Sequence, residues 1–208
     1  MNLAIDLFTG SGSFEKVART LNYEVISIDI RRRKGTCEPT LKVDITNLNE
    51  DIFKSLKPKI IWAGIPCDIW SNASGGFHLD ENFNPKTQKA VEHIKILNKT
   101  LAIIKKSTPD FYFIENPRGK LNKYPGLLKF LEETNGSITY CTLSSYGFKT
   151  TKPTMIATNF KKMKLKKMDN FGRGAKNNIP GTFDNMTKTQ RQETPKKLII
   201  DILKQIQL

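Results

Sequence analysis

Hydrophobic runs and amphipathic stripes alternate along residues 1–160 of this chain. Short apolar runs, most of them rich in β-branched residues, are typical of buried strands and lie at residues 2–8, 23–30, 41–45, 59–65, 111–116, 138–143 and 154–159. Apolar residues at helical spacing lie at residues 14–21, 91–104 and 127–133. Strands that alternate with helices favour a parallel sheet with helices on its faces. We therefore expect an α/β fold with a mostly parallel, doubly wound sheet.

The last quarter of the chain has a different pattern. Residues 161–194 are rich in Lys, Asn, Gly and Thr and show little periodicity, which predicts a small, irregular appendage. Thr194 and Pro195 form a typical helix start, and apolar residues at helical spacing follow as far as Ile206. We predict a core domain at residues 1–160, a basic appendage at 161–194, and a last helix at 195–208 that packs back on the core.

Positive charge is concentrated in the same last quarter. The chain has 34 Lys and Arg against 20 Asp and Glu, a formal net charge of +14. Residues 161–208 contain 12 basic and 4 acidic residues, and the run from Lys161 to Lys167 opens this segment. Such a patch is typical of phosphate binding, although a solvated basic surface gives the same composition. Charge therefore indicates a nucleic-acid partner without proving one.

Composition excludes several classes of protein. With 38% hydrophobic and 26% charged residues, the chain can form a core and is not disordered throughout. No stretch approaches the roughly 18 apolar residues of a membrane span, and the first residues do not resemble a signal peptide. The three cysteines are too few and too scattered for a disulfide framework or a zinc site. We expect a cytoplasmic protein with no membrane partner and no metal.

Two glycines and a carboxylate mark a candidate nucleoside-binding site. Gly10 and Gly12 follow the first predicted strand, and Asp29 stands at the end of the second. Glycines at this position let the backbone approach a ligand, and the carboxylate can accept hydrogen bonds from ribose hydroxyls. The third glycine of a pyrophosphate cradle is missing. A nucleoside cofactor is therefore the functional interpretation, and a plain structural turn is the alternative.

A cysteine and a glutamate stand where two further strands end. Cys67 follows Pro66 directly after the 59–65 strand, and Glu115 lies at the end of the 111–116 strand. The carboxyl ends of parallel strands border the ligand crevice, where an accessible thiol can act as a nucleophile. A buried carboxylate is costly unless it is paired or functional. The alternatives are a small buried hydrophobe at Cys67 and, for Glu115, a structural role in which a local helix N-terminus or an ion pair with Arg118 holds the carboxylate.

Taken together, the order and spacing of these elements resemble the DNA cytosine C5-methyltransferase family, particularly its short phage-encoded members. The resemblance covers about residues 3–160 and the last helix. The stretch from Asp6 to Phe14 resembles the family's S-adenosylmethionine-binding turn. Pro66-Cys67, with Ser71 and Ala73 behind it, resembles the nucleophile loop, and Glu115-Asn116 matches the Glu-Asn motif.

The resemblance implies a Rossmann-like methyltransferase fold that transfers a methyl group from S-adenosylmethionine to C5 of a flipped-out cytosine in double-stranded DNA. S-adenosylhomocysteine would be the product. It implies that Cys67 forms a covalent adduct and that Glu115 holds the base. Thr150, Lys152 and Thr154 replace the family's Gln-x-Arg-x-Arg motif, so Lys152 is the candidate cation beside the base.

The resemblance also supplies the other candidate residues. The cofactor-binding candidates are Asp6, Leu7, Phe8, Gly10, Gly12, Phe14, Asp29, Ile30, Asp44, Ile45 and Pro66. The nucleic-acid-binding candidates are Ser71, Arg118, Lys149, Lys161, Lys162, Lys164, Lys166, Lys167 and Arg173.

Other functions fit parts of the pattern. The missing arginines and the short basic segment fit a catalytically weakened relative that binds DNA or another protein in an anti-restriction or regulatory role. An enzyme of similar build that acts on RNA or a free nucleotide is a further alternative. An amino-methyltransferase fits less well, because the loop at residues 65–68 carries a cysteine instead of that class's polar-Pro-Pro-aromatic motif. The chain could act as a monomer, or a protein partner could supply target recognition, and the sequence leaves both alternatives open.

Overall fold

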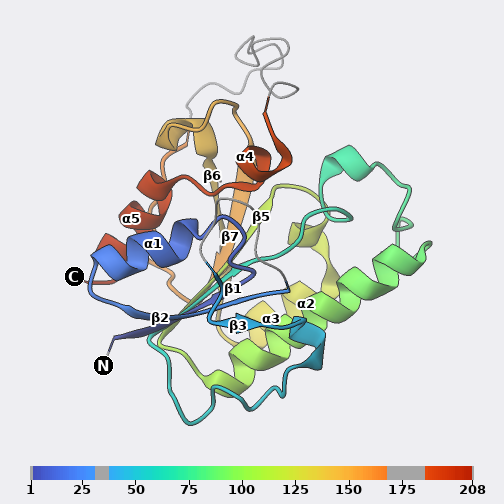
Figure 1. The fold of residues 1–208 in the computed structure, drawn as a ribbon. Coiled ribbons are helices and arrows are strands. Elements are labelled where there is room, and N and C mark those ends of the chain that lie inside the picture. Colours follow the sequence, from blue (N-terminus) through green and yellow to red (C-terminus); the bar gives the residue numbers. More distant parts are fainter. Residues whose placement is uncertain (1, 31–37, 168–185, 208) are drawn as a thin grey trace.

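The computed structural model describes residues 2–30, 38–167 and 186–207, and its centre is a seven-stranded sheet (Figure 1). The strands are β1 (Leu3–Leu7), β2 (Glu24–Asp29), β3 (Leu41–Lys42), β4 (Ile60–Gly64), β5 (Phe111–Pro117), β6 (Ser137–Thr142) and β7 (Pro153–Thr158). They are ordered β3-β2-β1-β4-β5-β7-β6, and β7 runs antiparallel to both of its neighbours. The prediction of a mostly parallel α/β sheet is confirmed.

Helices cover both faces of the sheet. Helices α1 (Ser13–Thr20) and α5 (Lys196–Gln205) lie on one face, and α2 (Gln88–Ser107) and α3 (Pro125–Glu133) lie on the other (Figure 1). Each pair buries its apolar stripe in a separate hydrophobic cluster against the sheet. A further short helix, α4 (Lys188–Gln192), precedes α5. None of the helices in the described ranges is long and apolar enough to cross a membrane, and the expected cytoplasmic location stays a prediction.

The period of two along each strand explains why the central strands are apolar throughout. In β5, Tyr112 and Ile114 face the cluster that contains α2, whereas Phe113 faces the cluster that contains α5. Because both faces are covered, successive residues all need apolar side chains, and the strands read as continuous hydrophobic runs. The last helix of the prediction does pack back on the core, through Leu198 and Ile202 among others.

Two predicted elements differ from the structure. The strand expected at residues 41–45 stops at Lys42, because the Asp44 carboxylate accepts a hydrogen bond from the Thr46 amide (2.8 Å) and begins a 3-10 turn, Ile45–Asn47. The segment expected to be irregular contains α4, which begins with a capping box between Thr187 and Gln190. Arg173 and the rest of residues 168–185 lie outside the described residues.

Candidate active site

A cavity of about 650 Å³ opens at the carboxyl edge of the sheet, where β1, β2, β4 and β5 end. It lies at the point where the strand order reverses between β1 and β4, the position at which open α/β sheets bind ligands. Its volume suits a ligand of nucleoside size with room for a second small group. The predicted residues that line it are Asp6, Phe8, Gly10, Phe14, Asp29, Ile30, Asp44, Ile45, Pro66, Cys67, Glu115 and Lys152.

Two cofactor candidates do not line this cavity. Leu7 is fully buried in the cluster beneath α2, because successive residues of β1 point to opposite faces and Asp6 takes the other one. Gly12 caps the start of α1 in the left-handed region, with φ at 72°. Leu7 therefore anchors the end of β1 in the core, and Gly12 allows the backbone to enter α1.

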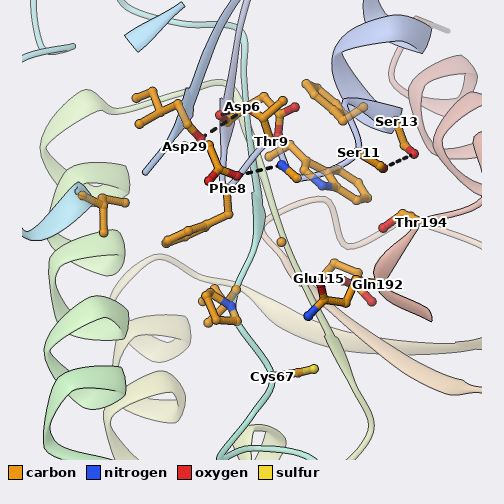
Figure 2. A pocket seen from close by; sticks show the side chains of 18 of the residues that line it. Asp6, Phe8, Thr9, Ser11, Ser13, Asp29, Cys67, Glu115, Gln192 and Thr194 are labelled. Atoms are coloured by element: carbon orange, nitrogen blue, oxygen red, sulfur yellow. Dashed lines mark hydrogen bonds between the residues drawn. The ribbon is translucent and has the colours of Figure 1, made fainter. Parts of the chain in front are cut away.

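The turn after β1 is tied to the end of β2. The amides of Phe8 and Thr9 both donate to the Ile28 carbonyl, at 2.9 and 3.0 Å, and the Gly10 amide donates to the Asp29 carboxylate at 2.9 Å (Figure 2). Gly10 has a φ of 54°, a conformation that side chains with a Cβ rarely adopt. The two strand ends therefore form one preorganised wall of the cavity.

Asp6 carries an unsatisfied acceptor at this wall. Its side chain is 1% exposed, and its Oδ2 atom has no hydrogen-bond partner among the described residues. Burial raises the pKa of Asp6 well above its usual range, and the nearby Glu15 and Asp29 carboxyls add to the effect. A buried polar atom without a partner is costly, so a donor supplied by a ligand is the natural way to satisfy it.

Cys67 and Glu115 lie at the other end of the cavity (Figure 2). Glu115 pairs with Gly64 across β4 and β5, so its carboxyl lies beside the loop that carries Cys67. The Asn116 side-chain amide donates to the Ile65 carbonyl at 2.8 Å, which fixes the loop directly before Cys67. The structure therefore brings the predicted nucleophile and the predicted base-binding carboxyl together.

The two loops after β4 and β5 are joined along their backbones. Ser71 forms an isolated bridge with Gly119, and the Lys120 amide donates to the Trp70 carbonyl at 2.7 Å. The contact leaves no room for a side chain, because a Cβ on Gly119 would lie 2.4 Å from the Trp70 carbonyl oxygen. Ser71, predicted to bind nucleic acid, thus belongs to the frame that holds the nucleophile loop.

Burial and nearby charges set the protonation of the reactive groups. Burial raises the pKa of the Cys67 thiol, the Glu115 carboxyl raises it further, and Lys152 lowers it. Burial also raises the pKa of Glu115, again opposed by Lys152. Glu115 Oε1 has no hydrogen-bond partner among the described residues. The site therefore favours a protonated thiol beside a carboxyl that readily holds a proton.

The cavity has a wall that the sequence did not predict. Gln192 and Thr194 line it from the segment between α4 and α5, and Ser11 and Ser13 line it from the start of α1 (Figure 2). The capping signal at Thr187–Gln190 could have revealed α4. Its position beside the cavity depends on long-range packing and leaves no local signal.

The basic candidates do not form one patch. Phe160 packs on Phe111 at the start of β5, and Lys161 contacts the Asn135 side chain before β6, so Lys161 lies at the edge opposite the cavity. Lys166 is back at the carboxyl edge, where its amide donates to the Tyr146 hydroxyl at 2.7 Å.

The remaining basic candidates within the described residues are exposed. They are Arg118, Lys149, Lys162, Lys164 and Lys167. No group of three or more His, Cys, Asp or Glu side chains in the described ranges could hold a metal ion.

Comparison with known proteins identifies the family. The family model for C-5 cytosine-specific DNA methylases matches residues 4–161. The chain belongs to this family. Cys67, Glu115 and the glycine turn all lie within the matched range. No curated protein matches the chain.

Solved structures share the fold at low identity. A Dnmt2 methyltransferase from S. pombe has a TM-score of 0.55 at 13% identity, covering 79% of this chain and 53% of its own. A proposed DNA modification methyltransferase encoded within an E. coli prophage has a TM-score of 0.54 at 18% identity, with coverage of 76% and 46%. The Entamoeba histolytica methyltransferase EhMeth has a TM-score of 0.54 at 14% identity, with coverage of 81% and 57%. The chain thus spans about half the length of these structures.

Proposed function

We propose that this chain is an S-adenosylmethionine-dependent DNA cytosine C5-methyltransferase with Cys67 as its nucleophile. One observation carries the proposal: Cys67 and Glu115 share one end of a cavity whose other end holds Asp29 and Asp44. Family membership supports the same reaction class. The two ends of the cavity correspond to the two partners of a methyl transfer.

The cofactor end has the chemistry to hold S-adenosylmethionine. When bound, this cofactor supplies a methyl group on a positively charged sulfur. Asp29 would accept hydrogen bonds from the ribose hydroxyls, and Asp44 and Ile45 would border the adenine. The carboxyl oxygen of Asp6 that has no partner among the described residues would accept from a donor of the same ligand. This end of the cavity thus offers carboxyl acceptors for the hydroxyl and amine donors of the ligand.

The base end has the groups that activate cytosine. C5 of cytosine is a poor nucleophile, and addition of the Cys67 thiolate to C6 moves electron density onto C5. Glu115 donates a proton to N3 and accepts a hydrogen bond from the exocyclic amine, which stabilises the charge that develops on the ring. The methyl group would then pass to C5 and S-adenosylhomocysteine would leave. Loss of the C5 proton to water would break the Cys67–C6 bond, which restores the C5–C6 double bond and the thiolate, and N3 would return its proton to Glu115.

The raised pKa of Glu115 fits this sequence of steps, whereas the raised pKa of Cys67 means that its thiolate must be stabilised when the base binds. A Glu115 carboxyl that readily holds a proton can give it to N3. The Cys67 thiol must lose its proton when the base binds, and the Lys152 ammonium favours the thiolate that results. Because Cys67 lies inside a cavity, the cytosine must leave the base stack to reach it.

DNA phosphates have a candidate surface beside the cavity. Three segments approach one another at this side of the carboxyl edge, at residues 118–124, 143–152 and 166–167, and we call them the basic rim. Their backbones are linked there, since the Arg118 amide donates to the Pro153 carbonyl and the Thr142 amide donates to the Lys166 carbonyl. They carry seven basic residues and no acidic one: Arg118, Lys120, Lys123, Lys149, Lys152, Lys166 and Lys167. Several stand against aromatic rings, such as Arg118 at 5.1 Å from the centre of the Tyr140 ring. We infer that the rim holds the DNA backbone.

Covalent trapping tests the proposal. In double-stranded DNA that contains 5-fluorodeoxycytidine, the fluorine blocks loss of the C5 substituent after methyl transfer, so the adduct with the nucleophile persists. With S-adenosylmethionine present, we expect a stable protein–DNA complex with the native chain and none with Cys67→Ala. Cys141→Ala is the matched control, because Cys141 is buried in the hydrophobic cluster between the sheet and α5. A complex that survives in Cys67→Ala would refute the assignment of the nucleophile.

A non-catalytic DNA-binding or protein-binding role is the second candidate. Thr154 favours it, since this fully buried residue donates its hydroxyl to the Lys152 carbonyl (3.1 Å) and supplies no cation where the family usually has an arginine. Binding of DNA and S-adenosylhomocysteine without any trapped complex would support this alternative.

A further inference from the structure

Lys152 contacts a segment that is distant in sequence. Its ammonium group donates a hydrogen bond to the Arg191 carbonyl at 2.9 Å and lies 5.4 Å from the centre of the Phe148 ring. The same charge lowers the pKa of both Glu115 and Cys67, so Lys152 stands close to the reactive end of the cavity. Its backbone has a φ of 29°, which is unfavourable for a residue with a side chain. Such strain persists where the surroundings fix the residue.

The contacted carbonyl belongs to the last turn of α4. Carbonyls in the last turn of a helix lack partners within the helix, and a cation is favourable there. The next residues, Gln192 and Thr194, form a wall of the cavity (Figure 2). Beyond them Pro195 starts α5, which docks on the core through Leu198 and its neighbours. Lys152 therefore holds the start of a cavity wall whose other end is held by α5.

We propose that Lys152 is a positioning residue whose ammonium group holds the Arg191–Thr194 segment against the cavity and so links the cofactor end to the base end. The identity of the ligand rests on the proposed function. The hydrogen bond by which Lys152 holds the Arg191–Thr194 segment does not depend on that function. An ammonium group has three donors, so Lys152 can keep the Arg191 carbonyl while it faces the Glu115 carboxyl or the base. Binding at one end then favours binding at the other, and this coupling is reciprocal.

Hydrogen exchange of the ligand-free protein tests the link directly. Lys152→Met removes the charge and keeps an unbranched side chain that is only one atom shorter, and Lys152→Arg keeps donors and charge. Lys162→Met is the matched control, an exposed lysine that directly follows Lys161 at the opposite edge. We expect at least tenfold faster exchange at the amides of residues 192–194 in Lys152→Met than in the native chain. Exchange in Lys152→Arg should be slower than in Lys152→Met, and Lys162→Met should exchange like the native chain. Unchanged exchange in Lys152→Met would overturn the proposal.

Calorimetric titration with S-adenosylhomocysteine tests the consequence for the ligand. We expect Lys152→Met to weaken binding about tenfold, the size of effect for a lost hydrogen bond to a charged group, and Lys162→Met to leave it unchanged.

If exchange rises as expected but the native chain does not bind S-adenosylhomocysteine, the link is supported and the cofactor assignment fails. If Lys152→Met speeds exchange throughout the chain, the variant has lost global stability and Lys152→Arg becomes the deciding comparison. Protection of the amides at residues 192–194 in Lys152→Arg supports the link, and fast exchange there in Lys152→Arg overturns it.

Discussion

At the scale of single residues, the site is defined by acidic and thiol groups that the fold buries. Asp6 and Glu115, at the two ends of one cavity, each have a carboxyl oxygen to which no group in the described ranges donates. The sequence predicted Glu115 and Cys67 because each stands at the end of an apolar strand, and it predicted Asp6 through the family resemblance of the turn that follows. It placed Leu7 in the same group wrongly as regards the cavity, because family resemblance does not separate the two faces of β1. It missed Gln192 and Thr194, whose position depends on contacts with residues far along the chain.

Asp6 should destabilise the ligand-free protein. Burial raises its pKa in the folded state, so between its usual value and this raised value the folded chain binds more protons than the unfolded chain. Its contribution to stability therefore falls as the pH rises through that window. We expect Asp6→Asn to be more stable than the native chain by about 1–3 kcal/mol at pH 7 and by less at pH 4.

Chemical denaturation at both pH values measures this difference. A stability difference that does not depend on pH would contradict the account of Asp6. If Asp6 serves the ligand, the same variant should bind S-adenosylhomocysteine more weakly than the native chain does.

At the scale of elements, one loop and one strand carry the chemistry. The loop after β4 holds Cys67, β5 holds Glu115, and the Ser71–Gly119 bridge joins the loops that follow β4 and β5. Most strands and helices were predictable, because their hydrophobic periods are strong. The antiparallel direction of β7 was not, since a pattern of apolar residues does not encode strand direction. The shortened β3 follows from the Asp44 side chain, a turn signal that an apolar run obscured.

Gly119→Ala should damage the site through the loop contact. The new methyl group would lie 2.4 Å from the Trp70 carbonyl oxygen, so the two loops must separate. We expect a loss of stability of about 1–3 kcal/mol and a loss of methylation of at least tenfold, because small displacements of reacting groups are costly. Binding of S-adenosylhomocysteine should change little.

Gly76→Ala is the control for this variant. It lies in the loop after β4, where a Cβ would meet nothing within 4 Å. Methylation assays and thermal denaturation of both variants measure the effects. Equal losses in the two variants would show that the close approach at Gly119 does not position the nucleophile.

At the scale of the whole molecule, charge is distributed unevenly around the sheet. Lysines on α2 pair with carboxylates, as Lys99 does with Glu50 and Lys105 with Glu133. The basic rim at residues 118–124, 143–152 and 166–167 contains no carboxylate. Sequence reasoning found the excess of basic residues but treated the run from Lys161 to Lys167 as one patch, because linear clustering does not show that the segment spans two edges of the sheet.

Neutralising lysines of the basic rim should weaken DNA binding more than neutralising lysines at the edge of the sheet opposite the cavity. We expect the double variant Lys120→Gln/Lys123→Gln to bind duplex DNA less tightly and to lower the slope of log affinity against log salt by about 2, one for each lost phosphate contact. Lys161→Gln/Lys162→Gln has the same change in charge and serves as the control. Equal effects of the two double variants in a fluorescence anisotropy titration over a range of salt would contradict the proposed rim.

The most direct test of the proposed chemistry follows the methyl group itself. Labelled S-adenosylmethionine is incubated with duplex DNA and either the native chain or Cys67→Ala, and the DNA is then digested to nucleosides. We expect the label in 5-methyldeoxycytidine with the native chain and none with the variant. Label in another nucleoside, equal label with Cys67→Ala, or no transfer by a native chain that binds both partners would contradict the account.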